Sequence, residues 1–272
     1  MGEHTVLRGG RGLAVPYDRF RLQWSQEEAD VRLMDFAAHL SVLTLPLDLD
    51  RLTTDLQAGW RLTGNIPVGY GLGSSGAVCA AVLDRFALPA ATRLGTPELR
   101  QILAIMEGFF HGSSSGTDPL LAYVQHPLLL GGGGSAGKTS LPNGWEAGWF
   151  LLDTGITRSG SPYIRRFLDA YERNPPSIAA GWLDPADRAI AALLANRSHD
   201  LYQEVTIISE FQQDCFPDFI PATYRDRWNG KDAYRLKLCG AGGGGMLLGL
   251  AVDAAKVEEV FGERLLWLAD GG

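Results

Sequence analysis

The sequence predicts an α+β protein with two domains. A strand-like segment at residues 60–66 leads through a glycine-rich turn into a helix-forming segment, and the second half closes with a strand, a glycine turn, a strand, a helix and a strand. The 272 residues, 46% of them hydrophobic, suffice for one large core or two smaller ones. A Gly- and Pro-containing stretch near the middle predicts a first domain at 1–140 and a second at 141–272.

In the first half we expect one strand or a strand pair over residues 13–24, then a helix that ends near residue 42. Another helix should start with Thr96 as its N-cap and Pro97 in its first turn, and end near Gly112. The apolar runs 128–130 and 149–152 are typical of buried strands.

In the second half the pattern predicts an antiparallel sheet with helices on one face. The expected helices lie near 161–173, 184–197 and 199–213, and the expected strands at 234–239, 246–252 and 264–268. A short helix should begin at Asp253.

Composition excludes several classes of function. The net charge is −7 and no dense Lys/Arg cluster occurs, so we expect no nucleic-acid partner. No signal peptide is evident and no apolar run is long enough for a membrane helix, so we expect no membrane partner. The three cysteines lack metal-ligand spacing and indicate reduced thiols in the cytoplasm.

The run from Pro67 to Gly76 carries the strongest functional signal. Its glycines let backbone N–H groups approach an anion, and the helix that follows adds unpaired donors and partial positive charge. The hydroxyls of Ser74 and Ser75 can bind phosphate oxygens or a magnesium ion. This loop therefore predicts a phosphate site.

A second cluster places two carboxylates, Glu107 and Asp118, on either side of a Ser/Gly turn. Phosphoryl transfer to an alcohol needs one carboxylate on magnesium and another that orients or deprotonates the hydroxyl. The structural alternative is a salt bridge of Glu107 at the helix end and an N-cap role for Asp118. Residues 237–245 form a third cluster, in which five glycines around one alanine join two strands. A tight hairpin needs fewer glycines, so we expect a ligand or the facing domain to approach this backbone closely.

These three clusters, in this order, resemble the three motifs of the GHMP kinases. Gly2-Glu3-His4 followed by Leu13-Ala14-Val15-Pro16 is similar to the first motif, and the Glu107–Asp118 segment is similar to the second in its mevalonate kinase form. Cys239 stands where the third motif commonly has Thr or Ser, which puts a side-chain role at that position in doubt and leaves the backbone role intact.

The resemblance implies a ribosomal-protein-S5-like first domain and a ferredoxin-like second domain, with ATP and Mg²⁺ as cofactors. The implied ATP-binding residues are Gly71, Leu72, Gly73, Ser74, Ser75, Gly76, Gly240, Gly242 and Gly243. Ser75 and Glu107 would hold Mg²⁺, and Asp118 would act on the acceptor alcohol. His4, Ser115 and Arg158 would contact the substrate, although Arg158 also fits an ordinary surface position.

The implied reaction is phosphorylation of mevalonate to 5-phosphomevalonate in isoprenoid synthesis. The alternatives are a kinase of another sugar or hydroxy acid, and a nucleotide-binding protein without turnover. The second alternative arises because the family begins with a Lys-bearing strand that this sequence does not show before Gly2, and we expect truncation to explain this difference. A homodimer is left open.

Residues 132–139 also fit the Walker A pattern, Gly-x4-Gly-Lys-Thr. A true P-loop must open a helix, whereas Pro142 follows here almost at once. We interpret the stretch as a flexible turn. His111, alone near a helix end, is interpreted as a partner of the helix dipole.

Overall fold

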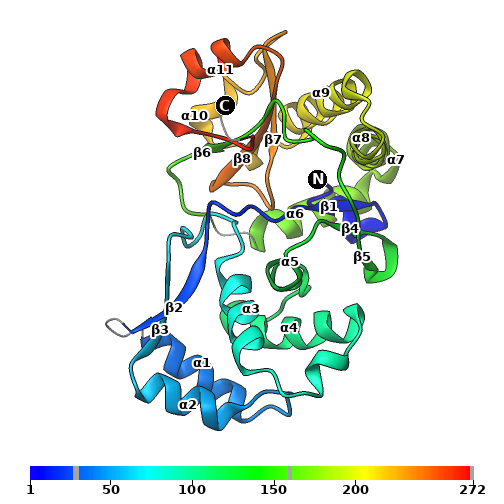
Figure 1. Cartoon of the computed structure of the whole chain (residues 1–272). Coiled ribbons are helices and arrows are strands. Elements are labelled where there is room, and N and C mark those ends of the chain that lie inside the picture. The colour runs from blue at the N-terminus through cyan, green and yellow to red at the C-terminus, as the bar shows by residue number, and fades with distance from the viewer. Residues whose placement is uncertain (27–30, 159–160, 270–272) are drawn as a thin grey trace. The chain divides into compact units, whose positions relative to one another are not determined.

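The computed structural model describes residues 1–26, 31–158 and 161–269, and its chain forms two compact units (Figure 1). The helical unit comprises Val15–Pro67 and Gly73–His126, and the sheet unit comprises Met1–Ala14, Val68–Leu72 and Pro127–Gly272. The first fourteen residues thus pack with the second half of the chain. The domain boundary near residue 140 stays a prediction.

Within its described residues, the helical unit contains five α-helices and one antiparallel pair of strands. The helices are α1 (Val31–Ser41), α2 (Leu49–Gln57), α3 (Ser74–Phe86), α4 (Thr96–His111) and α5 (Thr117–Val124), and β2 (Leu22–Gln26) pairs antiparallel with β3 (Trp60–Gly64). Phe36, Leu52, Leu83 and Leu103 are almost fully buried in its core. Helix α4 matches the expected bounds, with Gly95 rather than Thr96 at the N-cap position.

The sheet unit contains two sheets. In the smaller one, β1 (Gly12–Ala14), β4 (Leu128–Leu130) and β5 (Ala136–Lys138) pair antiparallel in the order β1-β4-β5. The predicted strand region 13–24 therefore supplies two strands that pair with other segments rather than with each other. The Walker-like stretch is a short 3₁₀ turn, Gly132–Gly134, followed by β5, so it forms part of a hairpin and not a helix start.

The larger sheet is antiparallel, in the order β7-β8-β6-β9. Its strands are β6 (Trp149–Asp153), β7 (Tyr234–Leu238), β8 (Met246–Ala251) and β9 (Leu265–Trp267). The helices of this unit include α6 (Ser161–Arg173), α7 (Pro175–Ile178), α8 (Asp184–Leu194), α9 (Ser198–Cys215), α10 (Ala222–Arg225) and α11 (Ala254–Phe261). Helix α8 is shorter than predicted, because Asn196 adopts a left-handed φ of 55° beyond its end.

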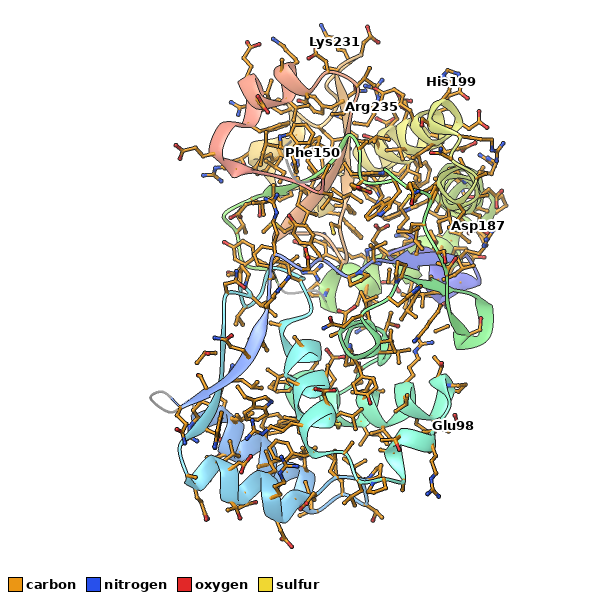
Figure 2. All side chains as sticks on the ribbon, in the orientation of Figure 1. Glu98, Phe150, Asp187, His199, Lys231 and Arg235 are labelled. Atoms are coloured by element: carbon orange, nitrogen blue, oxygen red, sulfur yellow. The ribbon has the colours of Figure 1, made fainter. Side chains whose placement is uncertain are left out.

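Helices cover both faces of this sheet rather than one. Phe150 is fully buried on one face, where its ring lies 6.3 Å from the Phe261 ring of α11 and 5.4 Å from the Trp267 ring (Figure 2). Figure 1 shows α11 and the α8–α9 pair on opposite sides of the sheet. The physical reason is that large aromatic side chains point to both faces and each face needs a cover.

None of the helices in the described residues combines the length and the apolar character that crossing a bilayer requires. All three cysteines are free, with Cys79 buried and Cys215 exposed.

Candidate functional site

In the helical unit, the predicted phosphate loop runs directly into the first turn of α3. Gly73 takes the N-cap position with a φ of 69°, which glycine adopts at low cost. The N–H groups of the first helical turn lack acceptors inside the helix, so Ser74, Ser75 and Gly76 present donors to an anion. A Cβ on Gly76 would lie 2.7 Å from the backbone nitrogen of Pro119, so glycine is needed where α3 meets α5.

Ser75 and Glu107 lie side by side. The Ser75 hydroxyl donates to Glu107 Oε1 at 2.8 Å, and the Ser114 hydroxyl donates to Glu107 Oε2. The Glu107 side chain is only 5% exposed, so these two hydroxyls satisfy a buried carboxylate. His111 Nε2 lies 2.9 Å from the Ser75 hydroxyl, a contact that its interpretation as a dipole partner did not foresee.

The Ser75 hydroxyl and the Glu107 carboxylate are suitable ligands for Mg²⁺. A hydroxyl and a carboxylate are hard ligands of the kind that Mg²⁺ prefers, and Mg²⁺ usually takes one or two protein ligands and completes its shell with phosphates and water. No group of three or more His, Cys, Asp or Glu that could hold a metal occurs in the described part of the chain.

Asp118 is exposed in the first turn of α5, next to the phosphate loop. A Cβ on Gly73 would lie 3.4 Å from the Asp118 Cβ, which places the carboxylate against the start of α3. The N-cap of α5 is Gly116, so Asp118 does not have the capping role of the structural alternative. Ser115 is exposed as well; its carbonyl accepts a hydrogen bond from Arg100 Nε at 2.8 Å, and its hydroxyl bonds that of Thr117.

In the sheet unit, the third glycine cluster joins β7 to β8 in a contorted loop. Five of its glycines have positive φ: Gly240, Gly242, Gly243, Gly244 and Gly245. A Cβ on Gly243 would lie 2.2 Å from the Tyr163 ring, and the N–H of Gly243 donates to Phe219 O at 2.7 Å. The neighbours that approach this backbone most closely therefore belong to the same unit.

Arg158 lies between two glycines that are far apart in sequence. A Cβ on Gly71 would lie 2.1 Å from Arg158 Nη2, and a Cβ on Gly240 would lie 2.4 Å from Nη1. The Arg158 N–H donates to Gly69 O at 2.9 Å, which ties the residue to the segment containing Gly71 and Leu72. Its Nη1 is buried and has no hydrogen-bond partner among the residues that the structure describes. A buried, unpaired guanidinium nitrogen is costly, so an anion at this position would be stabilised.

His4 is 1% exposed and packs against the backbone of the glycine loop at Ala241. Its Nε2 lies 3.1 Å from Ala241 O, and its ring stacks on Phe167 at 4.9 Å. Burial lowers the pKa of the His4 imidazole to about 4. The structure thus places His4 against the loop backbone, and its contact with a substrate stays a prediction.

Glu3 and Lys237 form a buried ion pair that the sequence reasoning missed. Lys237 Nζ contacts Glu3 Oε1 and donates to Leu238 O at 2.6 Å, with the Lys237 side chain 1% exposed. Burial raises the pKa of the Glu3 carboxyl, but the nearby Lys237 ammonium opposes this, and the net pKa is lowered to about 2. A lysine inside the apolar strand 234–238 was the available signal, because such a charge needs a partner.

Comparisons with known proteins bear on the family and the fold. Residues 44–126 match the family model described as GHMP kinases N terminal domain. A crystal structure of L. major mevalonate kinase in complex with R-mevalonate superposes with a TM-score of 0.63 at 19% identity, over 96% of this chain and 86% of the other. The chain has the GHMP kinase fold. The resemblance that the motifs indicated is thereby confirmed.

Two further kinases are similar to this chain. Streptococcus pneumoniae phosphomevalonate kinase, in complex with phosphomevalonate and AMPPNP, has a TM-score of 0.66 at 15% identity and covers 98% of this chain and 95% of its own. A mevalonate kinase of Thermococcus onnurineus (strain NA1) is 30% identical over 185 residues, 51% of this chain. That match spans 55% of the relative's length, so the chain aligns with about half of it.

Proposed function

We propose that the protein is an ATP-dependent kinase of a small-molecule alcohol, with mevalonate as the acceptor and 5-phosphomevalonate, an intermediate of isoprenoid synthesis, as the product. The observation that carries the proposal is the Ser75–Glu107 oxygen pair at the start of α3, with Asp118 beside the same glycine turn. The mevalonate kinase relatives support the choice of acceptor.

The nucleotide phosphates would bind the N–H groups that open α3, with Ser75 and Glu107 holding Mg²⁺. The metal, when bound, neutralises charge on the phosphate oxygens. Ser114 and His111 fix the orientation of these two ligands through their hydrogen bonds. Asp118 would orient the acceptor hydroxyl or take its proton, which its exposed position at the start of α5 permits.

In the sheet unit, the glycine loop also offers backbone N–H donors that suit phosphate oxygens. The N–H groups of Gly240 and Gly242 donate to no acceptor within the described residues, whereas the N–H of Gly243 is already used by Phe219. Arg158 would hold a carboxylate, since its Nη1 has no hydrogen-bond partner in the described part of the chain. His4 in the sheet unit and Ser115 in the helical unit stay candidates for acceptor contacts on the motif resemblance alone.

Phosphomevalonate is the second candidate acceptor, since a phosphomevalonate kinase has a similar fold and a fold does not fix the substrate. ADP release from Mg·ATP should be measured with mevalonate, phosphomevalonate, homoserine and galactose. Mevalonate should give the highest kcat/KM. A clear preference for a neutral sugar would exclude mevalonate and leave the kinase proposal standing, whereas no ADP release with any acceptor would contradict both.

The same assay tests Asp118. Asp118→Asn should lower kcat about 10²–10⁴-fold while ATP affinity stays within a few-fold, because a positioned base acts on the transition state. The matched control is Asp84→Asn, an exposed carboxylate on α3. A near wild-type kcat in Asp118→Asn would remove this residue from the mechanism.

A further inference from the structure

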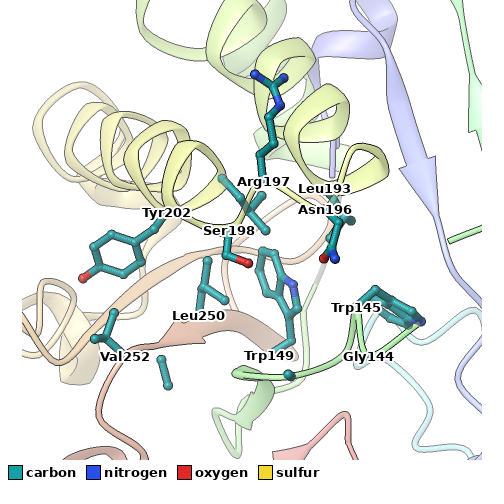
Figure 3. A pocket seen from close by; sticks show the side chains of 13 residues that line it. Gly144, Trp145, Trp149, Leu193, Asn196, Arg197, Ser198, Tyr202, Leu250 and Val252 are labelled. Carbon is teal, nitrogen blue, oxygen red and sulfur yellow. The ribbon is translucent and has the colours of Figure 1, made fainter. Parts of the chain in front are cut away.

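A pocket of about 180 Å³ lies in the sheet unit, and none of the proposed kinase residues lines it (Figure 3). Its floor is the sheet, where Trp149 of β6 pairs with Leu250 of β8. The turn between α8 and α9 contributes Asn196, Arg197 and Ser198 to one wall. The remaining lining residues are Gly144, Trp145, Ala147, Leu193, Leu201, Tyr202, Ala251 and Val252.

The pocket contains a buried hydrogen-bond donor without an acceptor. Trp149 is 2% exposed, and its Nε1 makes no hydrogen bond within the described residues. By contrast, the Nε1 of the equally buried Trp228 donates to Ser209 O at 2.9 Å. A buried indole N–H without a partner costs free energy, so an acceptor oxygen in this pocket would be stabilised.

Among the residues that line the pocket, the charged side chain is a guanidinium. The pocket lining includes one guanidinium, Arg197, and no carboxylate; Arg197 is 56% exposed and pairs with Asp200 at 2.8 Å. Arg235 opposes Leu250 on the neighbouring strand β7, and its guanidinium carbon lies 5.4 Å from the Tyr202 ring centroid. Arg235 is 9% exposed, its Nε lacks a partner, and it forms no ion pair within residues 1–26, 31–158 and 161–269. The positive charge of Arg235 therefore lies next to Tyr202, one of the residues that line the pocket.

Size and shape favour a single aromatic ring. Trp145, Trp149 and Tyr202 supply flat apolar surfaces, and Leu250 and Val252 add aliphatic contact. A cavity of roughly 150 Å³ holds benzene, so a pocket of about 180 Å³ admits one ring with a small substituent. We propose that this pocket is a binding site for a small aromatic carboxylate, with the Trp149 N–H and the nearby guanidinium groups recognising its charge.

Benzoate is the probe, and the indole N–H signals of the ¹⁵N-labelled full chain are the readout. Millimolar benzoate should shift the Trp149 signal, assigned with Trp149→Phe, and leave the Trp228 signal in place. Trp149→Phe should weaken benzoate binding about tenfold, because a hydrogen bond to a charged group contributes on that scale. Benzamide, which has the same ring without the charge, should bind several-fold more weakly.

Arg197→Gln provides a second variant that does not disturb the core, and Arg173→Gln on α6 is its matched control. We expect weaker benzoate binding in Arg197→Gln and unchanged binding in Arg173→Gln. The proposal is overturned if benzoate leaves the Trp149 signal unmoved up to its solubility limit. It is also overturned if benzamide binds as tightly as benzoate, or if Arg197→Gln binds benzoate like the wild type.

Discussion

At the scale of single residues, the candidate site depends on which neighbour each side chain meets. The sequence marks Ser75 as a candidate ligand, and the structure adds that its hydroxyl lies 2.8 Å from a carboxylate oxygen of Glu107, which is 5% exposed. It likewise places the guanidinium of Arg158 against Gly71 and Gly240. Contacts between distant segments thus set the surroundings of both residues.

Ser75→Ala should weaken Mg·ATP binding by roughly tenfold, because it removes one hydroxyl ligand and one hydrogen bond to Glu107. Lys138→Ala is the matched control, since Lys138 belongs to the Walker-like stretch that forms β5. Isothermal calorimetry with Mg·ATP measures both. Affinity lost in Lys138→Ala and retained in Ser75→Ala would reverse the assignment of the nucleotide site.

Gly240→Ala should destabilise the fold by about 1–3 kcal/mol, because the new methyl group would lie 2.4 Å from Arg158 Nη1. In the double variant with Arg158→Ala, the clash is absent and that share of the lost stability should return. The double-mutant cycle should therefore give an interaction energy of about 0.5–3 kcal/mol between the two positions. Gly9→Ala is the control, because Gly9 has a φ of 87° but nothing within 4 Å of an added Cβ. Free energies of unfolding are measured with denaturant. If the effects of the two substitutions simply add, Arg158 does not lie against Gly240.

At the scale of elements, the crossing of α3 and α5 brings Asp118 to the phosphate loop. The two helices approach so closely that an added Cβ on Gly76 would lie 2.9 Å from the Asp118 carbonyl carbon and 2.7 Å from Pro119 N. These are backbone atoms, which cannot rotate away as a side chain can. The position of the carboxylate is therefore set by helix packing and not by the loop alone.

Gly76→Ala should lower stability by about 1–3 kcal/mol and also lower kcat, because α5 must move and carry Asp118 with it. Gly108→Ala in α4 is the matched control: an added Cβ there meets nothing within 4 Å, so this change should stabilise the helix by about 0.5–1 kcal/mol. Thermal unfolding and ADP release together test the pair. A Gly76→Ala variant with unchanged stability and rate would contradict the close packing.

At the scale of the whole molecule, pH links the buried groups of the sheet unit to the stability of the chain. The pKa of His4 is about 4 because burial disfavours its charged form, whereas an unfolded histidine has a pKa of about 6.5. The contribution of the neutral, buried His4 imidazole to the free energy of unfolding is fully present above pH 6.5. It is lost as the pH falls toward about 4. The Glu3 carboxyl, with its pKa lowered to about 2, loses its contribution in a separate window below about pH 4.5.

Stability should therefore fall by on the order of 3 kcal/mol between pH 6.5 and 4 through His4. His4→Gln should flatten this slope, whereas His199→Gln, which changes an exposed histidine on α9, should leave it as in the wild type. Urea unfolding at several pH values gives the slopes directly. An equally steep slope in His4→Gln would show that another group titrates in this window.

The sequence by itself determined several of the elements and indicated which chemistry the loops can support. The starts of α3 and α4 and the strands on either side of residues 240–245 follow from glycines, a proline in the first turn of α4 and apolar runs, which are local signals. The same local signals indicated Ser75, Glu107 and Asp118 and excluded the Walker-like stretch as a helix start. The roles of these residues in catalysis stay predictions.

Only the tertiary structure decided which of these residues meet. The Glu3–Lys237 pair joins positions 234 residues apart, and the Arg158 slot is formed by glycines from two separate loops. The helix on the second face of the sheet and the pocket at Trp149 likewise depend on how side chains from several elements pack. Spacing in one sequence encodes local periodicity, whereas contacts over such separations depend on the packing of the whole chain.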